Sequence, residues 1–290
     1  MSTVDMTKPA SRWLVSADWL AARLGSPDLV AVDGSYYLPA MQRDAQAEFL
    51  AGHIPGAVRF DIDAIADRSN PLPHTLPNTQ QFARDVGALG IADTDTIVVY
   101  EGGELFSAAR VWWTFRLFGA EKVFILDGGL PQWKREGRPL EQGSVTRPPR
   151  LFRAREPTRG RVASLERVRD ALSSHSAQVV DARSADRFHG RAPEPRPGVR
   201  SGHMPGALNV ASSEIVENGR LASLDKIRAA FAAGGVDLDR PIITSCGSGV
   251  TAAILWLALD ALGKEPQALY DGSWSEWGLP DGPPIATGPA

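Results

Sequence analysis

The two halves of this sequence repeat each other. The segment "VAVDGSYY…GHIPGAVRF" of the first half returns in the second half as "VVDARSAD…GHMPGALNV". Further along, "DGGLPQW" returns as "DGSWSEW". Because these landmarks recur in the same order, the chain is predicted to contain two copies of one domain. A chain of 290 residues is also long enough that its core normally divides in two.

Short apolar runs alternate with helix-like segments in both copies. Apolar, mostly β-branched runs lie at 30–33, 96–100, 123–126, 178–181 and 242–245. Helical patterns lie at 79–89, 107–118, 224–233 and 251–262. Continuous apolar strands separated by helices indicate a mostly parallel sheet with helices on both faces. The predicted fold class is therefore α/β, built twice.

The domain boundaries follow from composition. Residues 141–160 are rich in Pro, Arg and Gly and lack periodicity, so they are predicted to form a linker. The first domain is then expected to span 11–140 and the second 161–280.

The charge and the apolar pattern exclude several classes of function. With 31 Lys and Arg against 34 Asp and Glu, the formal charge is -3, and no basic block would follow a phosphate backbone, so nucleic acid is not an expected partner. No apolar run could span a bilayer, and the first residues lack the apolar core of a signal peptide. We therefore expect a cytoplasmic protein without a membrane partner.

The chain has a single cysteine, Cys246. One cysteine can form neither an internal disulfide nor a multi-thiolate metal site, which leaves a buried filler, an accidental surface thiol or a reactive thiol. Cys246 follows the predicted strand 242–245, at the edge where parallel sheets bind ligands. Gly247 and Gly249 allow the loop to turn backbone N–H groups inward, and these donors with the following helix favour a thiolate. The alternative is a small buried residue under a tight turn.

The loop after Cys246 and the positions of the histidines limit the reactions that Cys246 could catalyse. The segment "CGSGVTAA" has no arginine of the kind that binds phosphate in tyrosine-type phosphatases, so a phosphate ester is disfavoured. A cysteine hydrolase needs a histidine base beside the thiol. His53 and His203 occupy equivalent positions in the two copies, although only one copy has a cysteine, so both are predicted to hold a turn. His74 has no counterpart.

The paired "HIPGA" and "HMPGA" turns, the "DGGLPQW" and "DGSWSEW" segments and the lone cysteine of the second copy resemble two-domain rhodanese-type sulfurtransferases over roughly 11–279. The loop "CGSGVT" is similar to that of the 3-mercaptopyruvate sulfurtransferases, whereas thiosulfate sulfurtransferases carry basic residues there. The difference has a physical basis: thiosulfate is a dianion that calls for cations in the loop, while mercaptopyruvate carries its charge on a carboxylate away from the sulfur.

The resemblance implies roles for particular residues. It makes Cys246 the nucleophile that becomes a persulfide, and it assigns the substrate carboxylate to Arg187 and Arg196, whose guanidinium groups suit a bidentate contact. It implies a proton relay of Ser248, His74 and Asp63. The rest of the loop is expected to bind substrate, through Gly247, Gly249, Val250 and Thr251.

Other residues have simpler interpretations. Asp63 could be a helix N-cap and His74 a surface turn residue, and only the shared pattern favours the relay. Arg191 and Arg200 are expected to be solvated, Arg183 to be structural and paired with an acid, and Trp112 and Trp113 to belong to the core. Glu101 stands in the first copy where Cys246 stands in the second. A carboxylate cannot accept sulfur as a persulfide, so the first domain is predicted to be catalytically silent.

The expected activity is transfer of sulfur from 3-mercaptopyruvate through Cys246, with release of pyruvate. The acceptor would be a thioredoxin-like protein or a small thiol, or cyanide in a test tube. No metal or organic cofactor is required. Two alternatives stay open: the same chemistry on thiosulfate, and a non-catalytic partner-binding or redox-sensing module.

Overall fold

The computed structural model describes residues 11–289, and it contains two sheets of identical strand order. The first sheet has the order β1-β5-β4-β2-β3 and all its strand pairs are parallel. Its strands are β1 (Leu14–Val15), β2 (Leu29–Asp33), β3 (Val58–Arg59), β4 (Thr96–Tyr100) and β5 (Val123–Leu126). Its helical elements are α1 (Ala17–Ala21), the 3-10 turn η1 (Pro39–Met41), α2 (Ala45–Ala51), α3 (Thr79–Ala88), α4 (Ala108–Leu117) and α5 (Gly129–Arg135).

The second sheet has the order β6-β12-β11-β7-β8 and is also parallel. Its strands are β6 (Val162–Ala163), β7 (Gln178–Asp181), β8 (Leu208–Asn209), β11 (Ile242–Ser245) and β12 (Ala268–Tyr270). An antiparallel hairpin of β9 (Val216–Glu217) and β10 (Arg220–Leu221) extends from it. The helices are α6 (Leu165–Ser174), α7 (Ala185–Phe188), α8 (Ser212–Ile215), α9 (Leu224–Ala233), α10 (Ala252–Ala261) and α11 (Ser273–Trp277). The duplicated α/β fold is thereby confirmed.

Local sequence explains where the helices begin. A side-chain oxygen one residue before the helix accepts a backbone N–H of the first turn in five of them, through Ser16, Asp44, Asn78, Ser164 and Ser223. The two helices that follow the central strands, α4 and α10, have no such side-chain cap. At the start of α4 the N–H groups instead bind the carboxylate of Glu101, which belongs to the loop before the helix.

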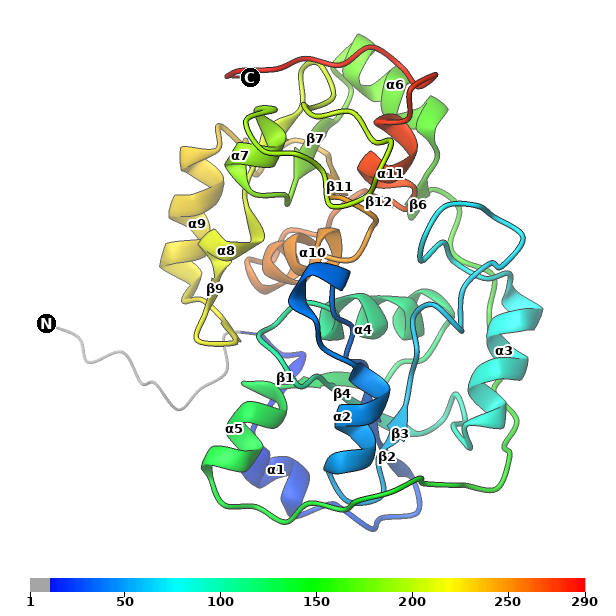
Figure 1. Cartoon of the computed structure of the whole chain (residues 1–290). Coiled ribbons are helices and arrows are strands. Elements are labelled where there is room, and N and C mark those ends of the chain that lie inside the picture. The colour runs from blue at the N-terminus through cyan, green and yellow to red at the C-terminus, as the bar shows by residue number, and fades with distance from the viewer. Residues whose placement is uncertain (1–10, 290) are drawn as a thin grey trace, which may run out of the picture.

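The largest hydrophobic cluster spans both domains. It contains buried residues from α3 and α4 of the first domain and from α9 and α10 of the second. In Figure 1, α4 and α10 lie next to each other between the two sheets, and Trp113 of α4 lies 5.9 Å from Trp256 of α10, centroid to centroid. Two separate clusters fill the outer faces, one under α1, α2 and α5 and the other under α6, α7 and α11. Burial of Trp112 and Trp113 confirms that both belong to the core.

The equivalent histidines hold turns, as the duplication predicts. His53 stacks on Phe49 with ring centroids 4.0 Å apart, and its Nδ1 lies 2.8 Å from the carbonyl of Phe49. His203 stacks on Phe188 at 4.1 Å, with Nδ1 2.9 Å from the carbonyl of Phe188. Both rings are buried, so their role is structural.

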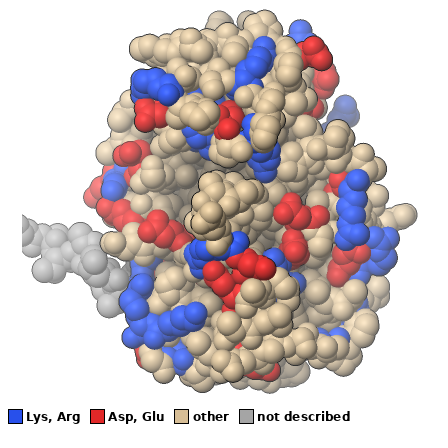
Figure 2. Space-filling model, in the orientation of Figure 1, with Lys and Arg blue, Asp and Glu red and all other residues tan. Residues whose placement is uncertain are grey.

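The segment 141–160 contains no helix or strand, and it runs along the first domain. Phe152 is buried against Phe82, and Arg150 forms an ion pair with Asp95. Among the described residues, no helix is long and apolar enough to cross a membrane. On the face shown in Figure 2, acidic and basic side chains are interspersed.

Candidate active site

Cys246 follows β11 directly, and β11 lies between β7 and β12 in the sheet. The residue is 1% exposed. Its backbone N–H donates to Ser273 Oγ (3.2 Å), and its carbonyl accepts from the N–H of Trp274 (2.9 Å). The cysteine loop is thus held by the "DGSW" turn, which the sequence repeats in the first domain as "DGGL".

Each glycine of the cysteine loop allows a guanidinium group to approach the backbone. A Cβ built at Gly247 would lie 2.9 Å from Arg187 Nη2. Gly249 has a φ of +76°, and a Cβ there would lie 2.9 Å from Arg110 Nη1 and from the carbonyl oxygen of Asp271. Glycine is required at Gly249 for backbone conformation as well as for space. Val250 is buried, and Thr251 precedes α10.

Arg187 belongs to a cluster organised by one buried carboxylate. Glu194 accepts from Arg187 Nε (3.2 Å) and from Arg183 Nη1 (2.8 Å), and Arg183 also pairs with Asp181. The prediction that Arg183 is structural and paired with an acid is confirmed. Arg187 keeps 23% of its side chain exposed, whereas the side chain of Glu194 is 4% exposed.

The other arginines of this segment differ from one another. Arg191 is exposed and pairs with Asp186, in agreement with a solvated position. The same expectation for Arg200 is wrong: its guanidinium group donates to the carbonyls of Trp277 (3.1 Å) and Pro283 (2.8 Å) and so fastens the C-terminal segment. The distant acceptors are invisible to local sequence patterns.

His74 lies between an acid and an arginine. It is 6% exposed, its φ is +59°, and its ring lies 4.7 Å from that of Tyr36. Its Nδ1 lies 2.7 Å from Asp63 Oδ1, and its Nε2 lies 2.9 Å from Arg196 Nη2. Because arginine can only donate, Nε2 carries the lone pair and Nδ1 carries the proton that faces Asp63. The close contact with His74 holds the pKa of Asp63 below its usual value.

The structure therefore joins three of the predicted residues, Asp63, His74 and Arg196, into one chain of contacts. Ser248 is buried in the cysteine loop, but His74 Nε2 contacts Arg196 instead of Ser248. The simpler interpretations do not describe these positions: His74 is buried, and it is Asp61, not Asp63, whose side chain accepts backbone N–H groups at this turn.

Sequence reasoning missed Arg110, a buried residue of α4. Its Nη2 donates to the carbonyl of His74 (2.8 Å) and to Asp271 Oδ1 (2.6 Å), and its Nη1 donates to the carbonyl of Gly249 (3.2 Å). The available signal was its position in "AARVWWTF", where it is the only charged residue of a buried helical segment.

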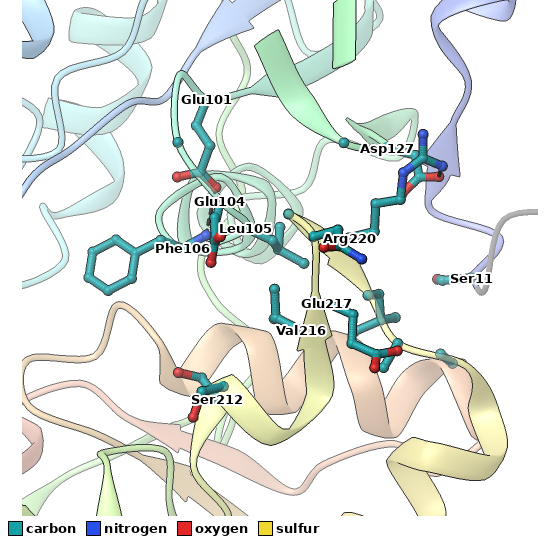
Figure 3. Close-up of a pocket in the computed structure, with 18 of the residues that line it drawn as sticks. Ser11, Glu101, Glu104, Leu105, Phe106, Asp127, Ser212, Val216, Glu217 and Arg220 are labelled. Atoms are coloured by element: carbon teal, nitrogen blue, oxygen red, sulfur yellow. Dashed lines mark hydrogen bonds and ion pairs between the residues drawn. The ribbon is translucent and has the colours of Figure 1, made fainter. Parts of the chain in front are cut away.

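The equivalent loop of the first domain surrounds a side-chain carboxylate, that of Glu101. Glu101 follows β4 as Cys246 follows β11. Its carboxylate accepts the N–H groups of Phe106 (2.7 Å), Ser107 (3.1 Å) and Ala108 (3.1 Å). Burial raises the pKa of Glu101 to about 7, although these hydrogen bonds lower it. Figure 3 shows Glu101 at one side of a large cleft, across from the ion pair of Asp127 with Arg220.

This cleft lies on the side of Glu101, and Cys246 is not among the residues that line it. Cys246 and the residues predicted to act with it lie at the other loop, where Arg187 meets Gly247 and Arg110 joins Gly249 to His74. Within residues 11–289, no group of three or more His, Cys, Asp or Glu is arranged to hold a metal ion.

Comparison with known proteins defines the class. The rhodanese-like domain family matches residues 16–136 and 164–279, and the chain belongs to this family, with two copies of the domain. It is 46% identical over 270 residues to the 3-mercaptopyruvate sulfurtransferase of Escherichia coli, covering 93% of this chain and 96% of that protein. It is 41% identical to the mitochondrial thiosulfate/3-mercaptopyruvate sulfurtransferase 1 of Arabidopsis thaliana, covering 98% and 79%.

The crystal structure of SseA from Escherichia coli has the same fold. Its TM-score is 0.83 at 45% identity, and the match covers 91% of this chain and 99% of that one.

Proposed function

We propose that this protein is a sulfurtransferase that takes sulfur from 3-mercaptopyruvate and passes it to a thiol acceptor through a persulfide on Cys246. The observation that carries the proposal is the position of Cys246 at the end of the central strand β11, with Arg187 against the next residue of the loop. Relatives at 46% and 41% identity over most of the chain are named for this activity.

The first half-reaction conserves atoms and charge as follows. The Cys246 thiolate attacks the sulfur of mercaptopyruvate, an S–S bond forms, and the C–S bond breaks with its electron pair moving to carbon. The resulting enolate of pyruvate takes up, at that carbon, the proton that the substrate thiol has lost. The persulfide remains on the loop, where backbone N–H groups stabilise its negative charge. A second thiol then removes the outer sulfur and regenerates Cys246.

Arg187 and Arg196 recognise the α-keto carboxylate. Arg187 is oriented by Glu194, and Arg196 by its contact with His74. A substrate carboxylate competes for the guanidinium group of Arg196, which frees His74 Nε2 to accept a proton from the substrate thiol or from Ser248. Asp63 keeps the proton of His74 on Nδ1, and so keeps Nε2 available as the base.

Intact-mass measurement tests the mechanism. Incubation with mercaptopyruvate should add the mass of one sulfur atom, and treatment with excess thiol should remove it. Cys246→Ser should acquire no adduct. A wild-type protein that gains no mass, or a serine variant that gains the same mass, would refute the persulfide mechanism.

Thiosulfate is a second candidate donor, because the plant relative carries both substrates in its name and because Arg187 brings a positive charge to the loop. Steady-state release of pyruvate from mercaptopyruvate and of sulfite from thiosulfate distinguishes the two donors. We expect the larger kcat/KM with mercaptopyruvate, since no basic residue lies within the loop itself.

The acceptor is proposed to be a thioredoxin-like protein or a small thiol, and comparing their rates of persulfide discharge tests the choice. A cytoplasmic location is also proposed, and cell fractionation tests it.

A further inference from the structure

We infer that Arg110, a residue of the domain without the cysteine, is a positioning residue. It holds the backbone of the cysteine loop and the ring of His74 in the orientations that the reaction needs. The inference rests on the proposed function, because it concerns the same site. It starts from one guanidinium group that bonds to three acceptors: the carbonyl of Gly249, the carbonyl of His74 and the carboxylate of Asp271.

The first bond orients the loop. In a trans peptide the C=O and the next N–H point in opposite directions, so a Gly249 carbonyl directed at Arg110 turns the N–H of Val250 away from Arg110. Gly249 is also the loop residue with a positive φ, a conformation that places successive N–H groups on one side. Arg110 thus selects the backbone arrangement in which loop N–H groups can stabilise a sulfur anion.

The second bond orients His74. This residue has a φ of +59°, a backbone conformation that non-glycine residues adopt at a cost and keep only when their surroundings hold them. The bond from Arg110 to its carbonyl is one such constraint. It keeps the ring at a position where Nδ1 meets Asp63 and Nε2 meets Arg196.

The third bond shows that geometry, not charge, is the contribution of Arg110. Its partner Asp271 neutralises it at 2.6 Å, and the side chains of the pair are only 4% and 13% exposed. The second oxygen of Asp271 accepts the N–H of Leu76, two residues after His74. Arg110 and Asp271 therefore join the "DGSW" turn, the cysteine loop and the His74 segment at one point.

The first domain offers a matched control. Asp127 is the repeat counterpart of Asp271, and it pairs with Arg220 of the second domain at 2.6 Å. Both pairs cross between the domains, but Arg220 faces the cleft at Glu101 in Figure 3 and is 38% exposed. A general role in joining the domains should belong to both pairs, whereas a role in positioning the reaction should belong to Arg110 alone.

The test compares two double variants that make the same chemical change: Arg110→Gln with Asp271→Asn, and Arg220→Gln with Asp127→Asn. Each removes both charges, so no unpaired buried charge remains. With mercaptopyruvate, the Arg110 double variant should lose about 10- to 100-fold in kcat with less than about a threefold change in KM, because Arg187 and Arg196 still bind the carboxylate. The Arg220 double variant should stay within about twofold of wild type in both.

A substrate-free measurement separates this inference from the proposed function. The rate at which iodoacetamide alkylates Cys246 should change at least about threefold in the Arg110 double variant and stay at the wild-type value in the Arg220 double variant. This readout holds whatever the sulfur donor is, so a wild type inactive on mercaptopyruvate would refute the proposed function alone. Equal changes in the two double variants, in kcat and in alkylation, would overturn the role of Arg110.

Arg110→Lys covers the case in which the double variant does not fold. Lysine keeps the pair with Asp271 but cannot present the planar fork that reaches both carbonyls. We expect a folded variant by circular dichroism with kcat still about 10-fold or more below wild type. Full activity in Arg110→Lys would show that a positive charge is sufficient and would overturn the positioning role.

Discussion

The loops after β4 and β11 have the same frame and different contents. Each follows the central strand of its sheet, precedes a helix without a side-chain cap and is tied by its first carbonyl to the following "DG" turn. In the first domain the N–H groups at the start of α4 bind the carboxylate of Glu101, whereas the second domain has the thiol of Cys246 at this place. The two loops thus share their position in the fold, whereas the thiol and the side chains around it, Arg187 and His74, belong to the second loop alone.

Moving the thiol from the second loop to the first tests what the two loops have in common. We expect the double variant Glu101→Cys with Cys246→Ser to stay at least about 10³-fold below wild type in pyruvate release, because Arg187 and the His74 pair remain at the other loop. Cys246→Ser alone is the reference. Turnover in the double variant clearly above this reference would show that the frame and a thiol are sufficient.

The second test concerns the arginine at each loop. Arg43 donates to the carbonyl of Gly102 (3.1 Å) in the first domain, much as Arg187 lies against Gly247 in the second. Arg187→Lys should raise KM for mercaptopyruvate about 10- to 100-fold, because lysine cannot form the bidentate contact with a carboxylate. Arg43→Lys should leave KM within about twofold of wild type. Equal effects would place substrate recognition elsewhere.

A third test separates the two glycines of the cysteine loop. Gly249→Ala should lower the free energy of unfolding by about 1–3 kcal/mol, because its φ is +76° and the new Cβ meets Asp271 backbone and Arg110. Gly247→Ala should cost less, because its Cβ meets only the end of the Arg187 side chain. Urea denaturation of both variants measures the difference, and a larger loss in Gly247→Ala would contradict the described geometry.

Glu101 should make the stability of the protein depend on pH. Its pKa rises from 4.5 to about 7 on folding, so between these values the folded state binds more protons than the unfolded state. The free energy of unfolding should therefore fall as the pH rises through this window, by about 1–3 kcal/mol from this group. Glu101→Gln should show a shallower fall than wild type, while Glu104→Gln, an exposed neighbour, should keep the wild-type slope. Identical slopes in all three would contradict the buried titration.

Sequence reasoning succeeded where the signal is local or repeated. Apolar runs gave the long strands β2, β4, β7 and β11, and the duplication gave the roles of His53 and His203. The edge strands β3 and β8 have two residues each, too few for a periodic pattern to appear.

The ion pairs of the site lay beyond such reasoning because their partners are distant. Arg110 and Asp271 are 161 residues apart, and the sequence around one residue does not reveal that it pairs with the other. Glu194 was likewise missed as the acid that orients Arg187, although it stands in the same insert. Its pairing with both Arg183 and Arg187 depends on the path of the folded insert, which composition does not report.

The shared core makes each half of the chain depend on the other. The faces of α4 and α10 that meet at Trp113 and Trp256 are apolar and pack against each other. A separated half would expose this face to water and would favour association with a second copy. Joining the two halves in one chain therefore gives each apolar face its partner at a fixed one-to-one ratio.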